Sequence, residues 1–305
     1  MNFKSIIKEI EQNDPAVYDQ LSTRRHAIKS IGSKVALAAL PLAIGSLFNK
    51  AYGKTTSAST MVAALNLALE MEYFQYNFYH TANAIAANYL IPAADASGFA
   101  TIEAHQKEHI TLLNSVITGL GGTPYTPPNY DGSSSNPNPY YIPTGTYDFT
   151  AGGTYATVFN TYTTFLTLAQ VFEDTAVHTY QGQMSNLLGN ASVITQAFQL
   201  QCTEARHAAH VRLVRRNLNT SDYPAPWITN NVPPPPVATG QPVSQFQPFY
   251  IGEDNTIQLY NTDITTLADS YATGGTVPKI SATAAFDEGM TTAQITSLIA
   301  PFLLP

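Results

Sequence analysis

The sequence predicts an all-α core: a four-helix bundle with a long crossover between its second and third helices, followed by an irregular Pro-rich extension that ends in a helix. Three observations lead to this fold class. Four segments between residues 57 and 218 repeat apolar residues at helical spacing. Acidic residues and histidines fall on their apolar stripes in the same order in each half. A long Pro-, Gly- and Asn-rich stretch separates the halves, as in bundles with one crossover.

Residues 1–53 are predicted to be an export signal and not part of the folded domain. The stretch TRRHAIK, with Arg24 and Arg25, resembles a twin-arginine translocation motif, although Ala27 stands at the usually aromatic position. The weakly apolar run that follows is shorter than the roughly 20 residues that span a membrane. The alternative is an amphipathic helix with an incidental arginine pair. The signal predicts a periplasmic or secreted protein.

The first bundle helix is expected over residues 57–89. Glu72 falls on its apolar stripe, within about 40° of Leu65 and Tyr79, whereas Glu70 points to the opposite face. A buried carboxylate is costly unless it is paired or metal-bound. Glu72 therefore needs a partner, and Glu70 can be an ordinary solvated charge.

The second helix is expected to follow residues 92–98, which offer capping residues, and to end at Gly121. Gln106 and His109 lie one turn apart on its apolar stripe, whereas Glu103 points away. An amide therefore occupies the position where the other half of the chain has a carboxylate.

The third helix is expected over residues 155–188, after a crossover of residues 123–153. Loops of this length are uncommon in compact domains but are required by a bundle with one crossover. Glu173 is centred in the apolar stripe of this helix. His178 points away from it and is predicted to lie at the surface or behind the site.

The fourth helix is expected over residues 192–218, and Glu204 and His207 share its buried face. In each half of the chain, nearly equal lengths separate the first acidic residue from the last histidine. All four helices should therefore deliver their polar side chains at one level of the bundle.

These segments resemble the ferritin-like domain family that includes desiccation-related proteins. The resemblance is carried by the stretches LNLALEMEYFQYNFY, AHQKEHITLL, FEDTAVHTYQG, EARHAAHVR and AFDEGMTTAQITSLIAPFL. It implies a ferritin-like four-helix bundle in which one helix gives a Glu and the next a Glu-x-x-His pair, twice over. The implied metal ligands are Glu72, His109, Glu173, Glu204 and His207, with Gln106 in place of an expected Glu. Gln75 also stands where the family often has an acidic residue.

The amide of Gln106 should weaken a second metal ion most, because it offers one neutral oxygen where a carboxylate offers two charged ones. The expected cofactor is one or two ions of iron or manganese, and zinc is a further candidate. One hypothesis is redox activity on peroxide or dioxygen, with Tyr76, Tyr79 or Tyr180 relaying electrons. A second is metal binding without turnover. A third is a metal-free degenerate bundle with a structural, interaction or stress-protection role.

The bundle domain is predicted to occupy residues 54–219, and residues 220–305 an extension that packs on it. Its final helix is expected over residues 292–303, with Thr291 as the cap. The extension lacks a periodic core of its own, so it either covers the site or packs on an otherwise exposed helix face. It also argues against a ferritin-type storage cage, because it would interfere with shell packing.

The composition of the chain limits the classes of partner that it is expected to bind. The net charge of −7, with only 11% charged residues, argues against nucleic acid, which requires a basic surface. Cys202 is the single cysteine, so the chain can form no intramolecular disulfide. No transmembrane segment is predicted after residue 53, metal ions are the expected partners, and an oligomer is compatible with the sequence.

Overall fold

The computed structural model describes most of the chain after residue 55. The described residues are 56–86, 89–133, 136, 138–218, 225–231, 245–258, 261–267 and 275–304. The predicted export signal, residues 1–53, lies outside them and stays a prediction. Thr55–Pro305 cluster as one compact unit. Among the described residues, no helix has the length and apolar character needed to cross a membrane.

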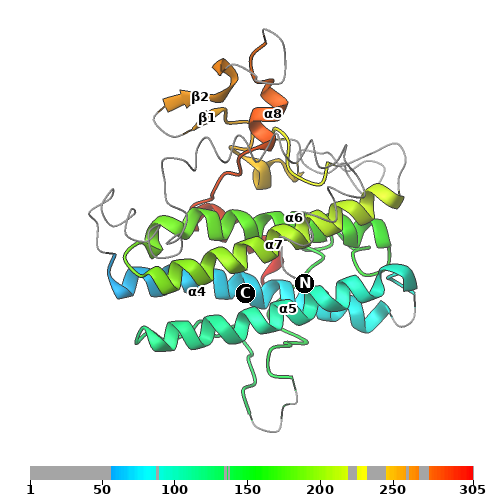
Figure 1. Cartoon of the computed structure of the whole chain (residues 1–305). Coiled ribbons are helices and arrows are strands. Elements are labelled where there is room, and N and C mark those ends of the chain that lie inside the picture. Colours follow the sequence, from blue (N-terminus) through cyan, green and yellow to red (C-terminus); the bar gives the residue numbers. More distant parts are fainter. Residues whose placement is uncertain are drawn as a thin grey trace, which may run out of the picture. The chain divides into compact units, whose positions relative to one another are not determined.

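Four long helices form the core (Figure 1). They are α4 (Ala58–Ala86), α5 (Ala93–Gly119), α6 (Tyr162–Gln183) and α7 (Ala191–Leu218), and the 3-10 turn η1 (Met184–Leu187) continues α6. Helix α4 contacts α5 and α6, and α7 contacts α6 and α5. The order around the bundle is therefore α4, α5, α7, α6. The predicted four-helix bundle with a crossover between its second and third helices is confirmed.

Two of the predicted helix boundaries are wrong. Helix α5 starts at Ala93, inside the stretch expected to precede it, because its first turn has good helix formers in Ala93, Ala94 and Ala96 and an acidic residue in Asp95. Helix α6 starts at Tyr162, later than expected, because residues 151–160 form successive turns. Gly152 and Gly153 both have positive φ there, which excludes a helix at that point.

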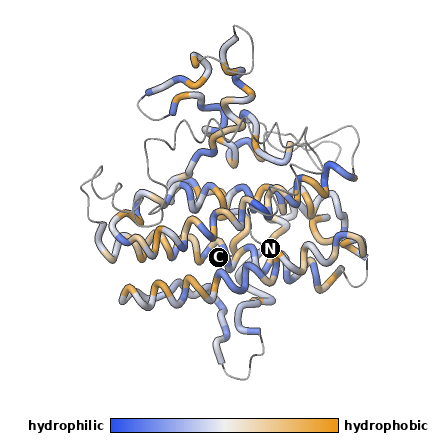
Figure 2. The backbone as a smooth tube through the Cα atoms, viewed as in Figure 1, coloured by the Kyte–Doolittle hydropathy of each residue, from blue (hydrophilic) through white to orange (hydrophobic). Residues whose placement is uncertain are grey.

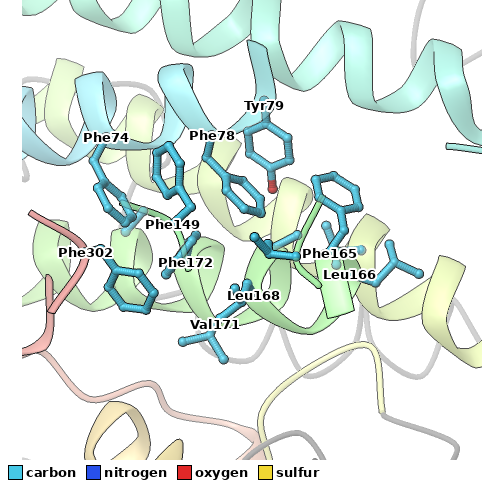
Figure 3. Packing of buried hydrophobic residues seen from close by; sticks show 14 of the residues in the cluster. Phe74, Phe78, Tyr79, Phe149, Phe165, Leu166, Leu168, Val171, Phe172 and Phe302 are labelled. Atoms are coloured by element: carbon cyan, nitrogen blue, oxygen red, sulfur yellow. The ribbon is translucent and has the colours of Figure 1, made fainter. Parts of the chain in front are cut away.

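The bundle contains two apolar clusters, and hydrophobic residues recur along all four helices (Figure 2). The larger is an aromatic cluster in which Phe74 lies 4.7 Å from Phe172 and Phe78 stacks on Phe165 at 5.2 Å, measured between ring centroids (Figure 3). On α5 and α7, residues 103–109 and 201–207 separate members of one cluster from members of the other. A polar layer therefore lies between the two.

Helix α6 is buried on all sides, with every residue from Thr164 to Tyr180 buried. The bundle covers one side, and parts of the C-terminal extension cover the rest, since α9 and η3 both contact α6. Many of these buried residues are polar or charged, so they need partners within the protein.

The extension contains short elements only. They are η3 (Gln247–Tyr250), an antiparallel pair of β1 (Ile257–Gln258) with β2 (Thr262–Asp263), η5 (Ile264–Thr266), α8 (Lys279–Ala284), α9 (Thr292–Ile299) and η6 (Ala300–Phe302). Thr291 caps α9 in a capping box with Gln294, as the sequence predicted for the cap. Tyr147, in the crossover, forms an isolated antiparallel bridge with Leu303, so the crossover and the end of the extension are joined.

Candidate metal centre

The six residues predicted for the site meet in the polar layer of the bundle. Two groups of three residues have possible ligand atoms within 4.8 Å of one another. The first comprises Glu72, His109 and Glu204, and the second Glu173, Glu204 and His207. Gln106 is fully buried beside them. All four helices therefore contribute to one cluster. This geometry agrees with the expectation that their polar side chains lie at one level of the bundle.

Glu204 belongs to both groups and lies at their centre. Its Oε1 is 2.9 Å from His109 Nδ1, and its Oε2 is 3.5 Å from His207 Nδ1. The amide nitrogens of Gln106 and Gln75 donate to the same Oε2, at 3.1 and 3.5 Å. The two oxygens of Glu204 face different ligand groups, so this carboxylate is suited to bridge them.

Glu72 has the partners that its burial requires. The hydroxyl of Tyr180 donates to its Oε1 at 2.5 Å, and His109 Nδ1 lies 3.2 Å from its Oε2. The half of the site on α4 and α5 is therefore well satisfied by protein groups.

In the half of the site on α6 and α7, several buried polar atoms lack a hydrogen-bond partner from the protein. Glu173 is fully buried, and its nearest cationic group, His207 Nδ1, lies 3.5 Å away without hydrogen-bond geometry. Buried side-chain atoms of the cluster that lack a hydrogen-bond partner are Glu173 Oε1 and Oε2, Glu204 Oε1, Gln106 Oε1, Gln75 Oε1 and His207 Nδ1. Buried polar groups are nearly always paired, and each unpaired one costs about 1–3 kcal/mol. Oxygen and imidazole ligands gathered in this way fit a hard or borderline divalent cation.

Without metal, the two imidazoles of the cluster favour their charged forms. Burial alone would lower the pKa of His109, but the carboxylates of Glu72 and Glu204 outweigh burial and raise it to about 11. Burial opposes charge on His207 as well, and Glu204 and Glu173 raise its pKa to about 10.

The pKa values of the three carboxylates in the cluster shift in different directions. Burial and the charge of Glu204 raise the pKa of Glu173 to about 8 and also raise that of Glu72. Burial opposes ionisation of Glu204 too, but His207 and His109 hold its pKa well below the ordinary value. The central carboxylate is thus the one most firmly ionised.

His105 is a member of the site environment to which sequence reasoning gave no role. Its Nδ1 lies 3.0 Å from Nε2 of His207, and the two rings stack with centroids 5.2 Å apart. A contact to the far nitrogen of a ligating histidine fixes the orientation of its ring. The signal was present in the sequence, because His105 lies on the apolar stripe of α5 next to Gln106.

Only two of the three tyrosines considered for electron relay adjoin the cluster. Tyr180 binds Glu72, and the fully buried hydroxyl of Tyr79 lies close enough to Glu173 for that carboxylate's charge to raise the pKa of Tyr79 well above its ordinary value, after burial itself. Figure 3 shows this hydroxyl pointing away from α4. Tyr76 instead donates to Asn138 in the crossover.

His178 is not at the surface, so the first of its two predicted positions is wrong. Its side chain is fully buried, because the extension covers the face of α6 that the helical pattern left exposed. Its imidazole lies with Glu253 and Asp287, which form a third group of possible metal ligands among the described residues.

The comparisons with known proteins agree with this architecture. None of the curated proteins compared with the chain matches it. The family described as a ferritin-like domain matches residues 60–217, which contain every residue of the cluster and nearly the whole length of the four bundle helices. This match covers more than half of the sequence. The chain therefore belongs to the ferritin-like domain family.

Proposed function

We propose that the bundle holds iron or manganese, with one ion bound tightly by Glu173, Glu204 and His207 and a second, weaker position at Glu72, His109 and Glu204. The observation that carries the proposal is the unpartnered carboxylate of Glu173, buried between helices beside unpartnered atoms of its neighbours. A cation bound there would satisfy these atoms together, which no described side chain does.

The missing carboxylate at position 106 disfavours a second divalent ion. With both imidazoles neutral, three carboxylates carry three negative charges, so one divalent cation leaves one negative charge and two leave one positive charge. A glutamate at position 106 would neutralise two divalent ions. Gln106 instead offers a neutral amide, which donates to Glu204 and adds no negative charge for a second ion.

Bound iron or manganese would supply one-electron chemistry toward peroxide or dioxygen, the activity that we propose for this site. The protein contributes a dry site: aromatic residues pack on one side, and all three carboxylates are buried. The hydroxyl of Tyr180 donates a hydrogen bond to Glu72, and Tyr79 lies beside Glu173. Each half of the site therefore has one buried phenol next to a carboxylate.

Elemental analysis tests the proposal directly. The full chain, purified without chelators or a metal-binding tag, should contain about one equivalent of iron or manganese and take up no more than two on reconstitution. The double variant Glu173→Ala, Glu204→Ala should lose it, whereas Glu108→Ala, an exposed acidic change on α5, should keep it. Absence of iron and manganese from the reconstituted wild-type protein would refute metal binding in the bundle.

A metal-free role is the second candidate, and the contacts of His109 favour it. His109 lies within 3.2 Å of two carboxylates, so the α4–α5 half of the cluster can be stable as an internal ion pair. In that case the bundle would serve a structural, interaction or stress-protection role, as in the desiccation-related type. The same elemental analysis separates the two candidates.

Export by the twin-arginine route is a separate proposal that rests on the sequence alone. Replacing both Arg24 and Arg25 by lysine should retain the protein in the cytoplasm, measured by cell fractionation against the unchanged chain. Equal export of the two would disprove it. This outcome has no bearing on the metal centre.

A further inference from the structure

We propose that His178, Glu253 and Asp287 form a second site for a divalent cation, best matched to zinc, that joins the C-terminal extension to α6. The site is distinct from the bundle centre and shares no residue with it. His178 comes from α6, Glu253 follows η3, and Asp287 follows α8. One ion would therefore connect three separate pieces of the chain.

The geometry of His178 is that of a ligand rather than of a hydrogen-bond donor. Its Nε2 lies 3.2 Å from Glu253 Oε1 and also 3.2 Å from Asp287 Oδ1. A single N–H can make a straight hydrogen bond to only one of these oxygens, and neither ring nitrogen has a hydrogen-bond partner. One nitrogen at equal distances from two carboxylates is the arrangement of three groups around a common ion.

The carboxylates are also incompletely satisfied. Glu253 Oε1 accepts the backbone N–H of Glu288 at 3.1 Å, but its Oε2 is buried without a partner. Asp287 Oδ1 has no partner either, although its side chain is 37% exposed. The three residues thus present open ligand atoms on a fully buried imidazole, a buried carboxylate and a carboxylate that reaches solvent.

Local charge favours a divalent cation. Arg212 lines the same cavity as Asp287, but it is occupied by Asp174, to which it donates from both terminal nitrogens. With a neutral imidazole, Glu253 and Asp287 carry two negative charges. A zinc ion would balance them, and imidazole with two carboxylates is an ordinary zinc ligand set when water takes a fourth position.

Solvent can reach the open side of this site. Asp287 lines a cavity of about 180 Å³ together with Val177, Ala205 and Trp227. The cavity supplies an entry path for the ion and room for a coordinated water, which a site closed on all sides would lack.

The position of Asp287 is fixed by a close approach of two backbones. Met290 donates its N–H to the carbonyl of His178 at 3.0 Å. A Cβ on Gly182 would come within 1.8 Å of Met290 O, and one on Gly289 within 2.5 Å of Gly182 N. Both glycines are therefore required for the segment that carries Asp287 to lie directly on α6 beside His178.

Zinc titration of the full chain carrying Glu173→Ala and Glu204→Ala tests the proposal, because the bundle site is disabled there. We expect one equivalent of zinc to bind, seen by calorimetry and by elemental analysis after dialysis, and to raise the unfolding temperature. Adding Asp287→Asn should weaken zinc binding at least tenfold and remove the temperature shift, since losing a ligand should cost no less than losing a supporting group.

Glu288→Gln is the matched control, since it removes the same charge one residue away while its side chain can still accept from Asn255 and Gln258. It should leave the zinc affinity within about twofold. Circular dichroism checks that each variant folds, and Asp287→Asn is isosteric and partly exposed, so it should fold. If zinc fails to bind to the bundle-disabled protein, or binds equally after Asp287→Asn, the proposal is wrong and His178 is a buried imidazolium paired with carboxylates. Neither result affects the iron or manganese assignment, which uses other residues.

Discussion

The two helical hairpins of the bundle repeat one pattern of polar residues, yet they differ in how they are stabilised. In the first, α4 and α5 are joined by His80 and Glu103, with Nδ1 and Oε1 2.6 Å apart in a partly exposed position. In the second, α6 and α7 are joined by Asp174 and Arg212, both buried, and Tyr250 of the extension donates to the same aspartate at 2.6 Å. Solvent screens the first pair and not the second.

The candidate metal ligands of the second hairpin are also more complete than those of the first. The α6–α7 hairpin keeps its Glu and its Glu-x-x-His pair, whereas the α4–α5 hairpin has Gln106 in place of the second glutamate. The complete ligand set therefore lies in the hairpin whose helix α6 is also covered by the extension. We infer that the second hairpin carries more of both the stability and the metal affinity.

The largest difference between the hairpins should appear on neutralising one acid in each. Asp174→Asn leaves the charge of Arg212 buried and unpaired, so we predict a loss of about 3–5 kcal/mol in the free energy of unfolding. Glu103→Gln removes a partly exposed acid and should cost less than about 1 kcal/mol. Urea unfolding of both variants measures this. Equal losses would mean that the hairpins are not stabilised differently.

A glycine in each hairpin gives the next comparison. Gly182→Ala places a Cβ against the backbone of Met290 and should destabilise the protein by about 1–3 kcal/mol, as overpacking does. Gly119→Ala in α5 meets no atom within 4 Å and should be neutral or slightly stabilising. Thermal unfolding monitored by circular dichroism distinguishes the two. A tolerated Gly182→Ala would contradict the close packing of the extension on α6.

Restoring the missing carboxylate should make the hairpins more alike. Gln106→Glu adds a fourth carboxylate to the cluster, so we predict that the weaker metal position gains affinity on the order of tenfold. Equilibrium dialysis with manganese, followed by elemental analysis, measures this occupancy. Gln201→Glu adds the same charge to α7 outside the cluster and should change nothing. Unchanged occupancy in Gln106→Glu would mean that position 106 is not a ligand position.

The smallest effect should be the pH dependence of the first hairpin. Burial opposes ionisation of Glu103, but His80 and Asn83 outweigh it and lower its pKa. A lowered folded pKa means that the contribution is complete above the unfolded pKa of about 4.5 and is lost as the pH falls through the folded value. Urea unfolding from pH 7 to pH 3 should show wild type and Glu103→Gln converging at low pH, from a difference of a few tenths of a kcal/mol. A gap that stays constant would exclude Glu103 as its source.

Helical periodicity was enough to predict the bundle and the residues that meet inside it. Glu72 lies on the apolar stripe of α4, and Gln106 and His109 share the apolar stripe of α5. Both stripes are visible because neighbouring turns of one helix can be compared within the sequence itself. The same reasoning missed His178, because a stripe pattern shows which face meets the bundle and not what covers the opposite face. The partners of His178, Glu253 and Asp287, come from irregular segments whose position depends on tertiary packing.

Helix starts were harder to predict than helix interiors for a related reason. The turns before Tyr162 depend on the positive φ of Gly152 and Gly153 and on hydrogen bonds such as that from Tyr155 N–H to the Thr150 carbonyl. These interactions compete with helix formation, and the spacing of apolar residues gives no information about them. It therefore does not predict the first residue of the helix.

The bridge between Tyr147 and Leu303 has a consequence for the order of folding. Each helical hairpin pairs two helices that follow one another in the sequence. Its contacts are therefore local and should form early. The bridge, together with the N–H of Asp148 donating to the Phe302 carbonyl, joins residues separated by half of the chain. Its loop-closure entropy is compensated only after both hairpins and the extension are in place. We therefore expect Phe302–Leu304 to gain protection from hydrogen exchange last during refolding, which makes this short segment a reporter of complete folding.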